Sequence, residues 1–259
     1  MNLGVNIDHI ALLREGRKME HPDPMDALGI LQMSGASQVT IHLREDRRHI
    51  CDDDARSIIR HSKIPVNLEC ALNRDIVDFA CEHKPHRVTF VPEKREEVTT
   101  EGGLDIESNF DAICKYTKQL KMHDVDVSLF LDPHVENIRR TKSAEIDKIE
   151  FHTGAYANIY AMLNSSLSKN RNSIKELEIP RFRLRAMLEA KLRELAECVA
   201  ETEEFGIESF AGHGLNYENV SDIVKITGIT ELNIGQSIIA RSVFVGLEQA
   251  ILQMRELIE

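Results

Sequence analysis

The chain has 259 residues, of which 42% are hydrophobic and 29% charged, and its formal net charge is −11. This composition is typical of a globular protein with one large domain or two small ones. The acidic balance argues against non-specific binding to nucleic acid or to an anionic membrane, and no apolar run reaches the roughly 18 residues of a membrane span. The five cysteines are scattered without metal-ligand spacing, and the first residues lack the pattern of a signal peptide. We therefore expect a cytoplasmic protein with reduced thiols.

Short apolar segments alternate with helical stretches along the chain. In order, the expected strands are residues 3–8, 38–44, 66–70, 87–92, 125–131, 148–153, 207–211 and 231–234. The expected helices are residues 23–35, 52–62, 74–83, 106–123, 135–144, 183–202, 217–227 and 237–258. Residues 157–180 have no clear period and are expected to be irregular.

Eight strand–helix units imply a parallel sheet with right-handed connections. Their number and the chain length fit a closed (β/α)8 TIM barrel with extra helices. We expect one domain over residues 1–259, with an extended insertion at about residues 157–204 between strands six and seven. An open doubly wound sheet is the alternative. It would more often carry a glycine fingerprint after the first strand, and "NIDHIALLREGR" has none.

Ionisable side chains gather at the C-terminal ends of these strands, where barrels of this kind carry their active sites. Strand alternation places the members of four pairs on a common face: Asn6 and Asp8, His42 and Arg44, Asn67 and Glu69, Glu150 and His152. Any one of them is more often a satisfied polar group than a catalyst. Directing several of them toward one point is unfavourable unless they are paired or functional. The conjunction therefore predicts an acid–base pocket, which His9, His49 and His213 also approach.

Two glycine-containing stretches follow strands seven and eight, "GHG" at residues 212–214 and "NIGQSII" at residues 233–239. Loops at these positions of a barrel frequently bind phosphate, because backbone N–H groups and a helix N-terminus face the anion. With Arg17 and Arg44 as nearby cations, they predict a phosphorylated substrate.

Two alternatives remain open from the residues alone. A metal hydrolase could use Glu150 and His152 with His42 and His213, although such enzymes often show His-x-His on an early strand. A non-catalytic sugar-phosphate binding protein is also possible. It would not need so many groups able to exchange protons.

Long runs of the sequence resemble one family, pyridoxine 5′-phosphate synthase of the deoxyxylulose-dependent vitamin B6 pathway. They are "LGVNIDHIALLR", "TIHLREDRRHI", "NLE", "VPEKREEVTTEGGLD", "VSLFLD", "IEFHTG", "AGHGLNYENV" and "ELNIG", in order along nearly the whole chain. The resemblance implies a barrel assembled into a homo-octamer. It implies condensation of 1-deoxy-D-xylulose 5-phosphate with 3-amino-2-oxopropyl phosphate to give pyridoxine 5′-phosphate, phosphate and water. It implies no metal and no organic cofactor.

The resemblance also assigns roles to individual residues. His42 and Glu69 resemble proton acceptors, His213 a proton donor, and Glu150 a carboxylate that stabilises charged transition states. Contacts to the amino-ketone phosphate fall on Asn6, Arg17, Gly214 and Gly235. Contacts to the deoxyxylulose phosphate fall on Asp8, His9, Arg44, His49 and Thr99. The loop at residues 93–103 resembles a mobile cover over the site.

Two features depart from the family's pattern. Gln236 stands after the strand-eight glycine, where the family commonly has histidine. Its amide can donate to phosphate but cannot carry charge, so phosphate binding there should depend less on pH. The segment between strands six and seven is also about twenty residues longer than expected, and residues 157–180 could cap the pocket or contact another subunit.

Overall fold

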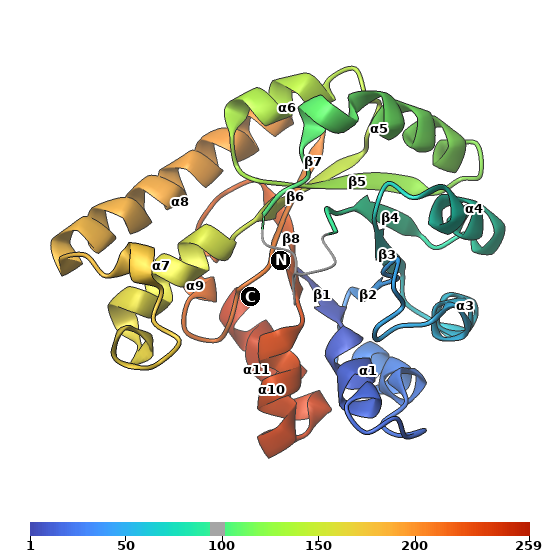
Figure 1. The fold of residues 1–259 in the computed structure, drawn as a ribbon, viewed down its shortest axis with the longest axis horizontal. Coiled ribbons are helices and arrows are strands. Elements are labelled where there is room, and N and C mark those ends of the chain that lie inside the picture. Colours follow the sequence, from blue (N-terminus) through green and yellow to red (C-terminus); the bar gives the residue numbers. More distant parts are fainter. Residues whose placement is uncertain (94–101) are drawn as a thin grey trace.

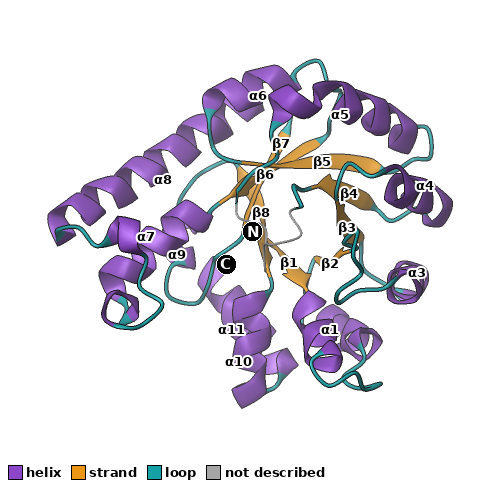
Figure 2. Ribbon diagram, in the orientation of Figure 1, coloured by secondary structure: helices purple, strands orange, loops and turns teal. Residues whose placement is uncertain are grey.

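Eight parallel strands close into a barrel in the computed structural model, which describes residues 1–93 and 102–259 (Figure 1, Figure 2). Each strand pairs with the next along the chain, and β8 pairs with β1. The strands are β1 Asn2–Asn6, β2 Gln38–His42, β3 Val66–Cys70, β4 Arg87–Phe90, β5 Asp126–Leu131, β6 Lys148–His152, β7 Glu208–Gly212 and β8 Ile229–Ile234. The prediction of a (β/α)8 TIM barrel is confirmed.

Helices surround the barrel and cover its outer face (Figure 2). They are α1 Asp8–Glu15, α2 Ala27–Met33, α3 Asp52–His61, α4 Arg74–His83, α5 Ile106–Lys121, α6 Val135–Thr141, α7 Gly154–Asn164, α8 Arg181–Glu204, α9 Val220–Val224, α10 Gln236–Val245 and α11 Leu247–Ile258. Three short 3-10 segments add to them: η1 Pro24–Asp26, η2 Leu167–Lys169 and η3 Lys175–Leu177.

Alternation along the strands divides apolar from polar side chains. On β2, Val39 and Ile41 are fully buried in the hydrophobic core beneath the helices. Gln38, Thr40 and His42 take the other face and point into the barrel, where they are also buried. The barrel interior is therefore unusually polar, and its hydrophobic core is the layer between strands and helices.

The first strand is shorter than expected because the chain turns at its end. β1 stops at Asn6, and α1 begins at Asp8 instead of the strand continuing. The Asn6 side chain accepts a hydrogen bond from the Asp8 backbone N–H at 2.9 Å, which fixes the turn. Asp8 and His9 therefore do not alternate across a strand but lie in the first turn of a helix.

The segment between β6 and β7 is more ordered than its sequence indicated. Helix α7 starts at Gly154 and packs against the 24-residue helix α8, and both extend outward from the barrel (Figure 1). A small second core of Ile159, Met162, Leu163 and Leu184 holds them together. The helix expected at residues 237–258 is divided into α10 and α11, because Gly246, with a φ of 84°, interrupts it.

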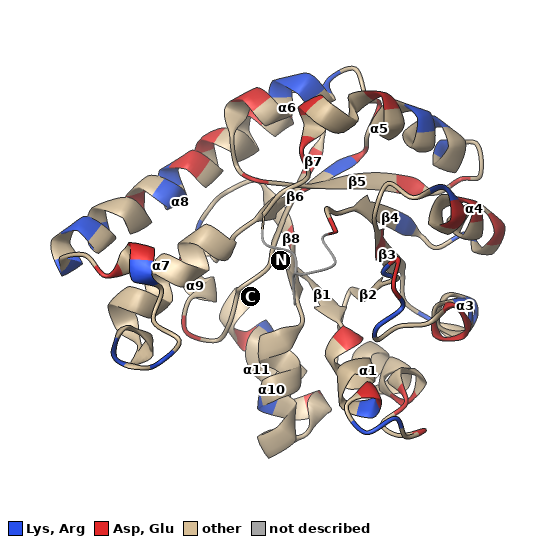
Figure 3. Cartoon of the chain, in the orientation of Figure 1, with Lys and Arg blue, Asp and Glu red and all other residues tan. Residues whose placement is uncertain are grey.

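Charged side chains of both signs are interspersed on the outer helices (Figure 3). All five cysteines are free thiols, as expected. Among the described residues, no helix combines the length and the apolar character needed to span a bilayer.

Candidate active site

A cavity of about 340 Å³ opens at the C-terminal ends of the strands. Most of the predicted site residues line it: Asn6, Asp8, His9, His42, Arg44, His49, Glu69, Glu150, His213, Gly214, Gly235 and Gln236. These residues come from β1, β2, β3, β6, the first turns of α1 and α10, and the loops after β2, β7 and β8. The barrel thus brings groups separated by more than two hundred positions in the sequence to one point.

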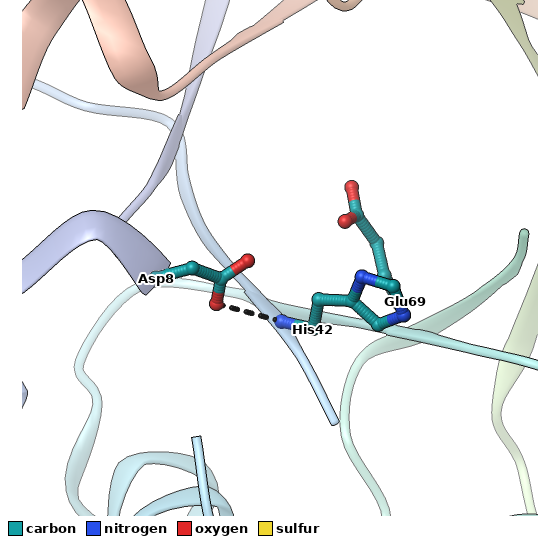
Figure 4. A group of neighbouring side chains, drawn as sticks. All are labelled: Asp8, His42 and Glu69. Atoms are coloured by element: carbon teal, nitrogen blue, oxygen red, sulfur yellow. Dashed lines mark hydrogen bonds between the residues drawn. The ribbon is translucent and has the colours of Figure 1, made fainter. Parts of the chain in front are cut away.

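Asp8, His42 and Glu69 form one side of the cavity, at the ends of β1, β2 and β3 (Figure 4). Asp8 Oδ1 accepts a hydrogen bond from the His42 backbone N–H at 2.9 Å, while Asp8 Oδ2 accepts one from Asn6 Nδ2 at 2.8 Å. Both carboxylate oxygens of Asp8 are therefore engaged, and the contact to His42 ties the start of α1 to the end of β2. Glu69 is the register partner of His42 on the neighbouring strand.

The His42 imidazole pairs with a carboxylate that the sequence analysis did not single out. His42 Nε2 lies 2.9 Å from Glu93 Oε1, and both side chains are almost fully buried. Burial works to raise the pKa of Glu93, but the hydrogen bonds from His42 and from the Glu45 backbone N–H outweigh it and leave that pKa below its usual value. His42 therefore faces a carboxylate on one side and the cavity on the other, which is a suitable arrangement for an acid–base group.

Glu69 and Glu150 are the two carboxyl groups at the floor of the cavity. Burial, together with the charges of Glu150 and Asp8, raises the pKa of Glu69 well above its usual range. Burial also raises the pKa of Glu150 to about 7, although Arg87 and the Asn233 amide oppose this change. A carboxyl group with a pKa near neutrality can both give and accept a proton at physiological pH.

His213 sits above this floor in a conformation that few side chains adopt. Its φ is 71°, and the Thr153 hydroxyl lies 2.8 and 2.7 Å from the carbonyl oxygens of Gly212 and His213, which share its one proton and hold the loop in place. Burial and the neighbouring His152 lower the pKa of His213 to about 4. The imidazole is therefore neutral at pH 7.

His152 stands behind His213, outside the cavity lining. The two ring centroids are 4.9 Å apart, and His152 Nδ1 lies 2.9 Å from Asp132 Oδ1. The other oxygen of Asp132 accepts a hydrogen bond from the Gly103 backbone N–H at 3.0 Å. A Cβ on Gly103 would lie 2.0 Å from the Asp132 backbone nitrogen, so only glycine allows this approach.

The rim of the cavity carries the predicted glycines. Gly214 has a φ of 80°, and a Cβ on Gly235 would lie 2.8 Å from the Asn6 Cβ. Helix α10 starts at Gln236 directly after Gly235. Its free N–H groups thus lie at the rim, where they and the helix dipole favour an anion.

Two predicted residues are not among those that line the cavity in the part of the chain that the structure describes. Arg17 follows α1 as an exposed residue and is not part of the cavity lining, and Thr99 falls outside the described residues. Conversely, Asn233 lines the cavity and donates to Glu150 Oε2 at 2.6 Å. Asn233 begins the stretch "NIGQSII" but is not among the site residues that the sequence predicts. The alternation of Glu231, Asn233 and Gly235 along that strand was the signal that could have included it.

A metal-binding set can also be tested against the geometry. Within residues 1–93 and 102–259, one group of carboxylate and histidine ligand atoms lies close enough to share an ion, namely Asp8, His42 and Glu69 within 4.8 Å. This group differs from the metal ligands considered for a hydrolase. Two of those, Glu150 and His152, are hydrogen-bonded to Asn233 and to Asp132 respectively. Asp8 Oδ1 and Oδ2 each accept one hydrogen bond, and His42 Nε2 faces Glu93 Oε1, so an ion held by this group would share or displace contacts that these atoms already make.

The fold and the cavity together define a TIM-barrel enzyme with an acid–base site. A family model described as pyridoxal phosphate biosynthesis protein PdxJ matches residues 3–259. The chain is 56% identical over 259 residues to the pyridoxine 5′-phosphate synthase of Aliarcobacter butzleri (strain RM4018), covering 100% of this chain and 99% of that protein. It is 56% identical over 258 residues to the enzyme of the same name from Sulfurovum sp. (strain NBC37-1), covering 100% of both. The chain therefore belongs to the PdxJ family and is an enzyme of pyridoxal phosphate biosynthesis.

Solved structures of other enzymes share the barrel. KGPDC from Streptococcus mutans superposes with a TM-score of 0.62 over 99% of this chain and 96% of that one. Phosphoribosyl anthranilate isomerase from Thermus thermophilus gives a TM-score of 0.56 over 99% and 98%. The identities are 9% and 11%, so these likenesses concern the fold alone.

Proposed function

We propose that the chain is a pyridoxine 5′-phosphate synthase that condenses 1-deoxy-D-xylulose 5-phosphate with 3-amino-2-oxopropyl phosphate, releasing phosphate and water. The observation that carries this proposal is the full-length match to the PdxJ family, combined with a cavity in which two floor carboxyl groups have pKa values raised by burial. The two phosphorylated substrates are the partners. No cofactor and no metal takes part.

Several proton transfers are needed in this reaction. The amine of one substrate adds to the ketone of the other, water and phosphate leave, and a carbon–carbon bond closes the ring. His42 and Glu69 act as proton acceptors, and Glu150 stabilises the positive charge of an iminium. The neutral state of His213 in the free protein suits its role as donor only after substrate binding. The phosphate charges favour the protonated imidazole, so His213 gains its proton when the substrates enter.

Phosphate binding belongs to the rim of the cavity. Asn6, Gly214, Gly235 and Gln236 bind the phosphate of the amino-ketone beside the N-terminus of α10. Asp8, His9, Arg44, His49 and Thr99 bind the deoxyxylulose phosphate. Arg17 supplies a further cation to the amino-ketone phosphate.

The direct test is incubation of the purified protein with both phosphorylated substrates, followed by chromatographic detection of pyridoxine 5′-phosphate. We expect product only when both substrates are present. Glu69→Gln serves as the matched control for contaminating activity. Binding of both substrates without product would leave a sugar-phosphate binding protein in place of the synthase.

The protein works as a cytoplasmic homo-octamer. Val243 and Phe244 on α10 are 69% and 86% exposed, and Leu13 on the neighbouring α1 is 54% exposed. Large apolar side chains of this kind, close together on one surface, are typical of subunit contacts. Sedimentation analysis of the wild type and of Phe244→Ser tests the assembly, and a monomeric wild type would exclude it.

A further inference from the structure

A chain of buried polar side chains runs beneath the cavity from β4 to β6. Arg87, Gln38, Asn233 and Glu150 are each no more than 6% exposed. Arg87 Nη2 donates to Gln38 Oε1 and to Glu231 Oε1. Gln38 Nε2 donates to Asn233 Oδ1 at 2.8 Å, and Asn233 Nδ2 donates to Glu150 Oε2 at 2.6 Å. The four residues thus connect a permanent cation to a floor carboxyl group through two amides.

Arg87 determines which atom donates and which accepts in every hydrogen bond of this chain. A guanidinium can only donate, so the oxygen of the Gln38 amide must face Arg87. The nitrogen of Gln38 then faces Asn233 and, at 2.8 Å, the carboxylate of Glu231. This forces the oxygen of Asn233 toward Gln38 and its nitrogen toward Glu150. Neither amide can turn over without placing two acceptors or two donors in contact, which is unfavourable in a buried site.

A glycine on β1 makes room for the central bond. Gly4 is the register partner of Gln38 on one side and of Asn233 on the other. A Cβ at position 4 would lie 2.0 Å from Asn233 Oδ1 and 2.8 Å from Gln38 Nε2. The two side chains therefore meet across β1 only because residue 4 has none.

We propose that Arg87 and Gln38 are positioning residues that fix the Asn233 amide as a hydrogen-bond donor to Glu150 and thereby keep Glu150 available as a carboxylate during turnover. This inference rests on the proposed function of Glu150 in pyridoxine 5′-phosphate synthesis. Arg87 and Gln38 touch neither the cavity nor, by this geometry, a substrate.

Two groups oppose the effect of burial on the pKa of Glu150: the charge of Arg87, which is the larger effect, and the hydrogen bond from Asn233. On β3, burial raises the pKa of Glu69 and disfavours its charged form, while on β8 Glu231 carries a like charge, which Arg87 on β4 pairs at 2.7 Å. The flanking strands β5 and β7 present Phe130 and Phe210 as the register partners of Glu150. Above them, His213 has its pKa lowered to about 4 by burial and is neutral. Arg87 is thus the one cation in this set, and it acts on Glu150 from below.

Two substitutions of Gln38 test the relay, with one matched control. In Gln38→Glu the side chain keeps its shape but, when ionised, can only accept, so Asn233 turns its nitrogen to residue 38 and its oxygen to Glu150. Glu150 must then hold a proton, and we expect the acidic limb of the kcat profile to move to higher pH by about one unit or more. Turnover at pH 7 falls about tenfold, while KM stays within about twofold. The new oxygen in Gln38→Glu also faces Glu231 Oε1, which lies 2.8 Å from Gln38 Nε2, so the uncharged Gln38→Met is the stricter test. Gln38→Met no longer orients the Asn233 amide and adds no charge, so the acidic limb of the kcat profile should move to higher pH by a smaller amount.

The control is Thr89→Val, which removes a buried hydrogen bond of 2.7 Å to Asn67 Oδ1. That oxygen still accepts from Arg87 Nε at 3.2 Å, and the four hydrogen-bonded residues that lead to Glu150 stay in place. Thr89→Val should lower stability without moving the pH profile.

A second readout does not depend on activity. The carbonyl stretch of a protonated carboxyl group can be followed by infrared spectroscopy as a function of pH, with Glu150→Gln in each background identifying the Glu150 signal. The wild-type midpoint is expected near 7 and that of Gln38→Met higher. Unchanged midpoints and unchanged kcat profiles in the Gln38 variants, with a stability loss like that of Thr89→Val, would overturn the relay. If the wild type forms no pyridoxine 5′-phosphate, the proposed function fails while the infrared titration still decides the relay. If Gln38→Glu does not fold, Gln38→Met decides it.

Discussion

Replacing Glu150 by glutamine should stabilise the free protein at alkaline pH while lowering its activity. The pKa of this buried carboxyl group rises from 4.5 to about 7 on folding, chiefly because burial disfavours its charged form. The native state therefore holds the proton more tightly than the unfolded state, and stability falls as pH rises from about 4.5 to about 7. Each pKa unit corresponds to about 1.4 kcal/mol, so the penalty above pH 7 is on the order of 3 kcal/mol. A neutral glutamine does not incur it.

The measurement is chemical denaturation of both proteins at pH 5 and at pH 8. We expect Glu150→Gln to gain on the order of 3 kcal/mol relative to the wild type at pH 8, and most of this gain to disappear at pH 5. Glu256→Gln, an exposed position on α11, controls for the general loss of a negative charge. An equal pH dependence of unfolding in Glu150→Gln and the wild type would refute the reasoning that Glu150 is held in an unfavourable buried environment.

Three further outcomes are expected. His42→Asn and Glu69→Gln should each lower kcat by roughly a hundredfold or more with the fold intact, since each removes an acid–base group; near-normal turnover and unchanged circular dichroism in both would remove their assigned roles. Gln236→His should raise the ratio of its phosphate affinity to that of the wild type as pH falls through about 6.5, in calorimetric titrations with inorganic phosphate, whose own protonation affects both proteins alike. Activity should withstand prolonged chelator treatment; a stoichiometric metal signal that disappears together with activity would instead indicate that Asp8, His42 and Glu69 bind an ion.

The barrel could be predicted because its signals are local. The alternation of Val39 and Ile41 with polar residues on β2 identifies both the strand and its inward face. Helix α4 agrees with the prediction at both ends, since Asn73 caps it by accepting from the Asp75 and Ile76 N–H groups. Parity along the strands then indicated which polar side chains point toward the same mouth, and this requires no knowledge of distant contacts.

The elements that were missed depend on contacts between distant parts of the chain. The turn into α1 combines a local hydrogen bond, from the Asp8 N–H to Asn6 Oδ1, with a distant one, from the His42 N–H to Asp8 Oδ1, and only the distant one has no signal near Asp8 in the sequence. Helix α7 has apolar residues on most sides because it packs against both the barrel and α8, so its period is hard to recognise. The pairing of His42 with Glu93 joins residues 51 positions apart, and no local pattern encodes it.

In the proposed mechanism, phosphate binds at the rim of the cavity and protons are transferred at its floor, so KM and kcat should depend differently on pH. At the rim, the phosphate site that we propose consists of the backbone groups around Gly235 and the N-terminus of α10, which do not titrate, and burial keeps the pKa of His49 below its usual value. At the floor, burial raises the pKa of Glu69 well above its usual range and that of Glu150 to about 7. From pH 7 to pH 9, above the second pKa of phosphate near 6, KM should therefore stay within about twofold. Over pH 6 to 8, kcat should rise as Glu150 loses its proton. Initial rates at several substrate concentrations across this range separate the two parameters, and a KM that followed kcat with pH would mean that the floor carboxyl groups bind substrate instead of acting on it.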